Sequence, residues 1–192
     1  MKTDIVLAGV GGQGILTIAA IIAQAAVKSG LNVKQSEVHG MSQRGGSVEA
    51  HLRISSDTIH SDLIAPGTAD VVLAVEPMEA LRQRRYLAAD GAILANAKPV
   101  TNIGDYPELE TIHAEIRKSP KSVVFDAEGI AAKLGTARAM NMVMLGAISV
   151  FLDMPESLLK DQISAMFARK GEAIVKTNLD AFEAGKAAAS NK

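Results

Sequence analysis

D-I-V-L-A-G-V-G-G-Q-G-I, residues Asp4 to Ile15, is the stretch that decides the fold of this chain. It begins with the β-favouring run Ile5-Val6-Leu7, and four glycines follow within six positions. Glycine adopts positive φ and has no Cβ, so such a segment turns sharply and lets another group approach closely. The stretch therefore predicts a strand, a tight turn and then a helix from Ile15 to Lys28.

The glycine turn is also a candidate binding site, because the N–H groups and positive dipole end of the following helix favour an anion. Its spacing satisfies G-x-G-x-x-G, the dinucleotide fingerprint, but Lys34 stands where a ribose-binding acid is expected. Three interpretations stay open: a dinucleotide site, a turn that only lets helix and strand pack closely, and a site for an anion or a protein partner. The candidate residues are Gly9, Gly11, Gly12, Gln13 and Gly14.

The composition is that of an ordinary α/β protein. The 192 residues are enough for one domain, which we expect to span residues 1–192, and 48% of them are apolar. A net charge of −1 argues against a nucleic-acid-binding protein, which needs a basic surplus on one face. Aromatic residues make up only 3%, so a stacking platform for single strands is not expected either.

The chain contains no cysteine. It therefore offers no disulfide, no thiol nucleophile and no cysteine ligand for zinc or an iron–sulfur cluster. The first apolar run breaks at Gly9 and lacks the features of a signal peptide. No uninterrupted apolar segment reaches the roughly 18 residues that a membrane helix needs. We expect a cytoplasmic protein with no membrane contact.

Strands and helices alternate along the rest of the chain. Leu31–Val38 predicts a second strand, and the partial alternation of Ser47–Ile54 predicts an edge or interface strand. Continuous apolar runs are typical of buried parallel strands. Together the pattern predicts a three-layer α/β fold with a mostly parallel sheet, a Rossmann-like first βα unit and C-terminal helices. The buried strands are expected at Asp70–Val75, Gly91–Asn96 and Ser122–Phe125, and the later helices at Glu108–Lys118, Ala127–Leu134, Ala137–Leu152 and in two amphipathic segments after Asp153.

Ligands of such sheets bind outside the carboxyl ends of the strands, where the loop His39–Gly46 should lie beside the glycine turn. In this loop Arg44 is a planar donor suited to a phosphate or carboxylate, with a solvated or interface arginine as the alternative. His39 is either a base, with Glu37 nearby, or a structural histidine, and no histidine spacing indicates a metal site. Glu76, Asn96 and Asp126 also follow predicted strands. The candidate binding residues of the loop are Gln43, Arg44, Gly45 and Gly46.

Four motifs together resemble the gamma-type domain of the 2-oxoacid:ferredoxin oxidoreductases, and in particular the beta subunit of indolepyruvate ferredoxin oxidoreductase. The resemblance continues through the C-terminal helices and covers nearly the whole chain. The motifs are G-V-G-G-Q-G-I-L from Gly9, S-E-V-H-G-M-S-Q-R-G-G-S-V from Ser36, A-D-V-V-L-A-V-E-P-M-E-A-L-R from Ala69 and N-M-V-M-L-G from Asn141.

The resemblance implies oxidative decarboxylation of an aryl 2-oxoacid, with coenzyme A as acyl acceptor and ferredoxin as electron acceptor. It assigns thiamine diphosphate and the iron–sulfur clusters to a large alpha subunit, so this chain is expected to bind no cofactor alone and to contribute no catalytic residue. The missing cysteines and the absence of a G-D-G thiamine motif agree with this. Three roles stay open: a subunit that forms part of the coenzyme A or 2-oxoacid channel, a scaffold for the alpha subunit, and a free-standing nucleotide-dependent oxidoreductase.

Overall fold

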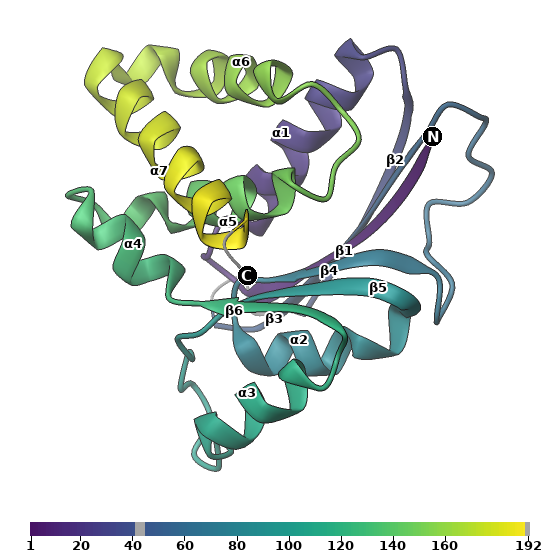
Figure 1. The fold of residues 1–192 in the computed structure, drawn as a ribbon, viewed down its shortest axis with the longest axis vertical. Coiled ribbons are helices and arrows are strands. Elements are labelled where there is room, and N and C mark those ends of the chain that lie inside the picture. The colour runs from purple at the N-terminus through teal and green to yellow at the C-terminus, as the bar shows by residue number, and fades with distance from the viewer. Residues whose placement is uncertain (41–44, 191–192) are drawn as a thin grey trace.

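The computed structural model describes residues 1–40 and 45–190, which form a six-stranded sheet covered by helices on both faces (Figure 1). The strands are β1 (Lys2–Val10), β2 (Asn32–His39), β3 (Ser47–Ser55), β4 (Ala69–Ala74), β5 (Leu87–Asn96) and β6 (Lys121–Phe125). Their order is β2-β3-β1-β4-β5-β6, with β1, β4, β5 and β6 paired in parallel and β3 antiparallel to both of its neighbours. Apart from the reversed β3, the strands run in one direction, so the predicted mostly parallel sheet is confirmed.

The helices form the two outer layers. One face of the sheet carries five of them, and α2 (Pro77–Gln83) and α3 (Leu109–Arg117) cover the other (Figure 1). Side chains alternate between the two cores along β1: Ile5 and Leu7 point to the five-helix side, and Val6 and Ala8 to the α2–α3 side. The three-layer prediction is therefore confirmed. The five helices are α1 (Ile15–Lys28), α4 (Ala127–Lys133), α5 (Met140–Ser149), α6 (Glu156–Phe167) and α7 (Glu172–Ser190).

Two expectations about single elements were wrong. The segment predicted as one helix from Ala137 to Leu152 starts as a 3₁₀ turn at Ala137–Ala139 and continues as the shorter α5. The strand expected at Ser47–Ile54, as an edge or interface strand, is observed at Ser47–Ser55 and is not an edge: it lies inside the sheet between β1 and β2, and β2 forms the edge instead. As a result, β2 does not pair with β1 as it would in a Rossmann unit.

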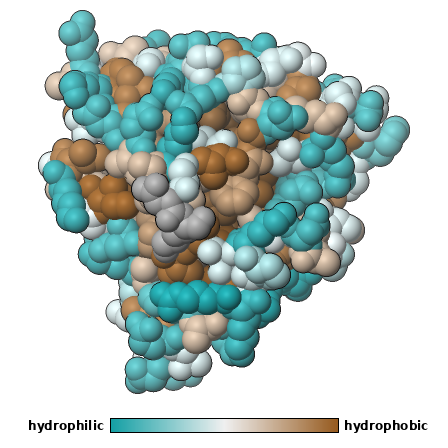
Figure 2. Space-filling model, in the orientation of Figure 1, coloured by the Kyte–Doolittle hydropathy of each residue, from teal (hydrophilic) through white to brown (hydrophobic). Residues whose placement is uncertain are grey.

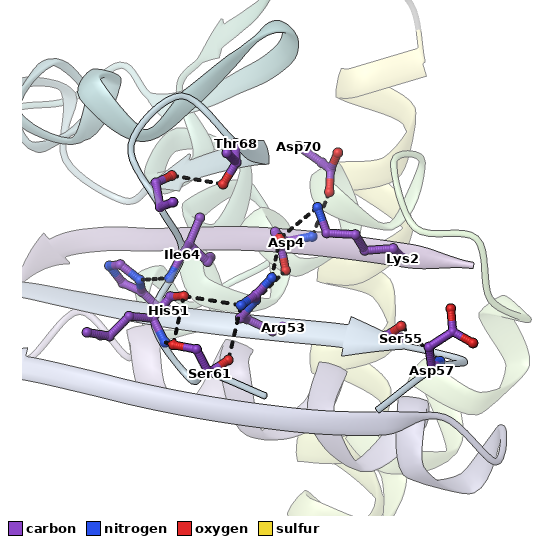
Figure 3. Close-up of polar contacts among 12 residues, drawn as sticks. Lys2, Asp4, His51, Arg53, Ser55, Asp57, Ser61, Ile64, Thr68 and Asp70 are labelled. Atoms are coloured by element: carbon purple, nitrogen blue, oxygen red, sulfur yellow. Dashed lines mark hydrogen bonds and ion pairs between the residues drawn. The ribbon is translucent and has the colours of Figure 1, made fainter. Parts of the chain in front are cut away.

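The polar face of β3 was the reason for the edge prediction, but much of that face is buried, and its charged side chains have polar partners inside the protein. Arg53 donates from Nε and Nη2 to the two oxygens of Asp4, over 2.8 and 3.1 Å (Figure 3). Its Nη1 donates to the carbonyls of Ser61 and Leu63, so it holds the segment between β3 and β4 against the sheet. Asp4 is only 1% exposed, and Lys2 is its second cation. Alternation identifies the polar face of a strand, but it does not show whether that face is exposed to water or covered by ion pairs within the protein.

His51, on the same face, is a structural histidine. Its Nδ1 lies 2.8 Å from the Ile64 nitrogen and accepts that backbone N–H. Nε2 therefore carries the ring proton and donates to Glu49 over 2.7 Å. Both ring nitrogens are engaged inside the protein, so His51 is not available as a base.

The tightest helix contact joins α5 to α7 through two glycines. A Cβ at Gly146 would lie 1.8 Å from the carbonyl oxygen of Phe182, and one at Gly185 would lie 1.8 Å from that of Val143. Only glycine at both positions lets the two backbones come this close. Helix α7 can therefore take this position in the core only because both Gly146 and Gly185 lack a side chain.

Candidate functional site

The carboxyl ends of β1, β2, β4, β5 and β6 lie along one edge of the sheet, as predicted, and amide side chains connect those of β1, β4, β5 and β6. Gln13 donates from Nε2 to the Val75 carbonyl after β4, and Asn96 donates from Nδ2 to the same oxygen. Oδ1 of Asn96 accepts the N–H of Ala127 at the start of α4. These bonds fix the edge on which the candidate residues stand.

The glycines of the turn have different tasks. A Cβ at Gly9 would lie 2.2 Å from Val75, and one at Gly14 would lie 2.7 Å from Nδ2 of Asn141, so both glycines permit close packing. Gly14 also has φ +81°. At Gly12, φ is +103° and a Cβ would meet nothing within 4 Å. The packing interpretation thus holds for Gly9 and Gly14, and Gly12 leaves room for another molecule.

Gln13 is engaged within the protein. Its Oε1 accepts the N–H of Val10 over 2.7 Å, while its Nε2 makes the bond to Val75 over 3.1 Å. Both ends of the amide therefore serve to close the turn. A ligand that approaches the turn would meet backbone groups rather than this side chain.

The far end of the loop His39–Gly46 lies against the turn. The N–H of Gly11 donates to the Gly46 carbonyl over 2.8 Å, and the N–H of Gly45 donates to the Gly11 carbonyl over 3.3 Å. Asn102 also donates to the carbonyl of Gly45. The turn and Gly45-Gly46 are therefore together as expected, although β3 separates the ends of β1 and β2. The other two candidates of this loop, Gln43 and Arg44, lie outside the described residues.

A cavity of about 460 Å³ opens between the turn, the start of α1 and the ends of β2 and β3. Glu37 and His39 both line it from one face of β2, opposite apolar side chains that include Leu16, which is 42% exposed. No side chain caps the N-terminus of α1 in the described chain, so its first N–H groups are open to a partner on this side. The cavity therefore combines apolar side chains and open helix N–H groups with the Glu37 carboxylate and the His39 ring. Its lining is Val10, Gly11, Gly12, Gly14, Ile15, Leu16, Thr17, Glu37, His39 and Val48.

Two buried acids beside this edge hold the neighbouring loops. Glu76, 1% exposed, caps α2 by accepting the N–H of Glu79 and also accepts from Val100 and from the Tyr106 hydroxyl. Burial, with the bond to Glu76, raises the pKa of Tyr106, so the hydroxyl stays protonated and keeps donating. Glu79 accepts from Ser47 over 2.6 Å, which ties α2 to the start of β3.

Sequence reasoning noted Glu76 at a strand end but missed these roles. The acid immediately before Pro77 is the signal for the helix cap. Nothing local indicates the bonds to Ser47 and Tyr106. Across the described ranges, no cluster of three His, Cys, Asp or Glu side chains could hold a metal ion. Within the same ranges no helix has the length and apolarity to cross a membrane.

Comparison with known proteins places these features in a family. The family model described as pyruvate ferredoxin/flavodoxin oxidoreductase matches residues 4–188. The chain is 40% identical to the indolepyruvate oxidoreductase subunit IorB of Archaeoglobus fulgidus, over 96% of this chain and 94% of that protein. It is 38% identical to the subunit of the same name from Methanothermobacter thermautotrophicus, over 99% of each.

Among solved structures, it is similar to the 2-oxoglutarate:ferredoxin oxidoreductase of Magnetococcus marinus, with a TM-score of 0.82 and 27% identity. That structure contains 2-oxoglutarate, coenzyme A and succinyl-CoA, and the similarity covers all of this chain but only 31% of that one. The family match and the relatives agree over nearly the full length. The chain therefore belongs to the pyruvate ferredoxin/flavodoxin oxidoreductase family.

Proposed function

We propose that this chain is the beta subunit of an indolepyruvate ferredoxin oxidoreductase, which oxidatively decarboxylates aryl 2-oxoacids with coenzyme A and passes the electrons to ferredoxin. The observation that carries the proposal is the similarity, over nearly whole chains, to two proteins named as indolepyruvate oxidoreductase subunits. The alternative is a scaffold subunit of an enzyme for another 2-oxoacid.

The redox chemistry belongs in this proposal to a large alpha subunit. A chain without cysteine cannot supply the thiolates that hold an iron–sulfur cluster. The clusters are therefore assigned to the partner, and the family resemblance assigns thiamine diphosphate to it as well, so this chain contributes surface to the assembled enzyme.

The proposed contribution is the glycine edge. Gly12 and Gly45 are exposed, and a Cβ at either would meet nothing within 4 Å, so a ligand can approach beside the start of α1, where an anionic group such as a phosphate of coenzyme A is favoured. The Magnetococcus relative was solved with coenzyme A bound. The alternative anion at the same edge is a carboxylate of the large subunit.

Co-expression with the large subunit tests the function. We expect the isolated chain to reduce no viologen with any 2-oxoacid, and the purified complex to reduce it with indolepyruvate far faster than with pyruvate or 2-oxoglutarate. Steady-state assays with each acid measure this preference. A complex that prefers a non-aryl acid would show that indolepyruvate is not its substrate. Activity of the isolated chain would refute the assignment of the redox chemistry to the partner.

Replacement of Arg44 by Ala separates the two assignments of the glycine edge. The loss of one hydrogen bond to a charged group weakens its contact by roughly 1.5–3 kcal/mol. If coenzyme A is the ligand, its KM should rise at least tenfold in the complex while subunit affinity is unchanged. If the large subunit supplies the anion, its Kd should rise instead. Arg117→Ala, at an exposed position at the end of α3, is the control, and an Arg44→Ala complex equal to it in both assays would contradict the site.

A further inference from the structure

We propose that a second cavity, of about 580 Å³, docks an acidic amphipathic segment of the large subunit. This inference rests on the proposed function, because it requires that a partner subunit exists. The cavity lies between the α4–α5 connection and the α6–α7 junction. We call it the basic groove and define it by Leu134, Arg138, Asn141, Phe167, Lys170 and Ile174.

The charge of the basic groove is one-sided. Arg138 and Lys170 line it, and no acid does. Arg138 makes no ion pair with the described residues, and the Lys170 ammonium lies 5.3 Å from the centre of the Phe167 ring without a carboxylate partner there. Two unpaired cations beside one cavity attract acidic groups and steer their association.

Part of the lining of the groove is apolar and reaches solvent. Leu134 is 37% exposed and Ile174 is 42% exposed, although both are large apolar side chains. Figure 2 shows apolar surface over the part of the molecule where α4 and α5 lie in Figure 1. Exposed apolar side chains next to charged ones are a common feature of protein–protein interfaces.

Two amide side chains that line this cavity have donors or acceptors left to form hydrogen bonds with a partner. The side chain of Asn141 makes no hydrogen bond to any described residue. Asn178 is 7% exposed and donates from Nδ2 to the Ile174 carbonyl, which leaves its Oδ1 available. A docked peptide segment offers both donors and acceptors to such amides.

The groove continues into the glycine edge. Asn141 packs against Gly14, and Thr17 lines both this cavity and the one at the turn. In the Magnetococcus relative the matching part is 31% of one polypeptide, so further parts of the same chain are available there to cover this fold. By analogy, we infer that the large subunit of the proposed complex supplies the corresponding cover here, rather than a second copy of this chain.

Charge reversal tests the docking surface. The double variant Arg138→Glu/Lys170→Glu should raise the Kd for the large subunit at least tenfold, measured by biolayer interferometry, and the salt dependence of binding should flatten. The matched control is Arg117→Glu/Lys121→Glu, which makes the same charge change at exposed positions on α3 and β6 that do not line the groove and should alter Kd less than twofold. Ile174→Asp should weaken binding as well. Because all these side chains are exposed, the thermal midpoint of each isolated variant should stay near that of the wild type, which checks folding.

The outcomes separate this inference from the proposed function. If the wild-type chain does not bind the large subunit, the proposed function fails and the inference fails with it. If the wild type binds and forms an active complex but the charge-reversed chain binds equally well, only the basic groove is refuted. If light scattering shows that the reversal disrupts a dimer of this chain and leaves the large subunit bound, a second copy is the occupant, and the inference is again overturned.

Discussion

Gly146→Ala should lower the free energy of unfolding by about 3 kcal/mol or more, the upper range for overpacking in a closely packed core. The new Cβ would lie 1.8 Å from a backbone oxygen of α7, whereas non-bonded heavy atoms normally approach to about 3.5 Å. A backbone carbonyl cannot rotate away as a side chain can, so α7 must move as a unit. Gly185→Ala places a methyl group against α5 in the same way.

Urea unfolding followed by circular dichroism measures this effect. Gly104→Ala is the matched control, because a Cβ there meets nothing within 4 Å and the residue has no positive φ. Its stability should be unchanged or should rise by up to about 1 kcal/mol, since alanine restricts the unfolded chain. If Gly146→Ala is as stable as the control, the close crossing of α5 and α7 does not exist.

The second large effect is expected at Arg53. Replacement by Met should lower the free energy of unfolding by about 3–5 kcal/mol, the range for removing one partner of a buried ion pair. Asp4 would stay 1% exposed with Lys2, which is itself half-exposed, as its remaining cation. The carbonyls of Ser61 and Leu63 would also lose their donor, so proteases should cut the segment between β3 and β4 faster.

A double-mutant cycle distinguishes a true pair from two independent losses. Asp4→Asn/Arg53→Met should be clearly more stable than the sum of the two single losses predicts, because no uncompensated charge stays buried. Arg117→Met, at an exposed site, should change stability by less than about 0.5 kcal/mol. Additive single losses would show that Asp4 and Arg53 do not interact.

The sequence predicted the ends of helices and strands well where residues close in sequence determine them. The turn glycine Gly14 precedes α1 and Lys28 ends it, which is the predicted span. The carboxyl edge followed from strand direction, because consecutive parallel strands end on the same side. β3 was misplaced because alternation reports the two faces of a strand but not its neighbours.

Contacts between residues far apart in the sequence could not be predicted, because local patterns do not report which elements are neighbours. Gly146 and Gly185 are far apart in the sequence, and neither position alone indicates a helix crossing. At the candidate site, the glycines and the end of the loop are where the sequence placed them. The role of Gln13 was not predictable, since it depends on which backbone groups the fold leaves without partners.

The reversal of β3 accounts for the hollow at the glycine edge. In a regular alternating α/β chain each strand leads into a helix, and that helix covers the neighbouring part of the sheet. Here β2 leads into a hairpin and returns directly as β3, so the chain omits one helix from the sequence of crossovers. Glu37, His39 and Val48, near the adjoining ends of these two strands, line the cavity beside α1. The cavity is thus a product of topology, because a direct return of the chain from β2 to β3 places no crossover helix there.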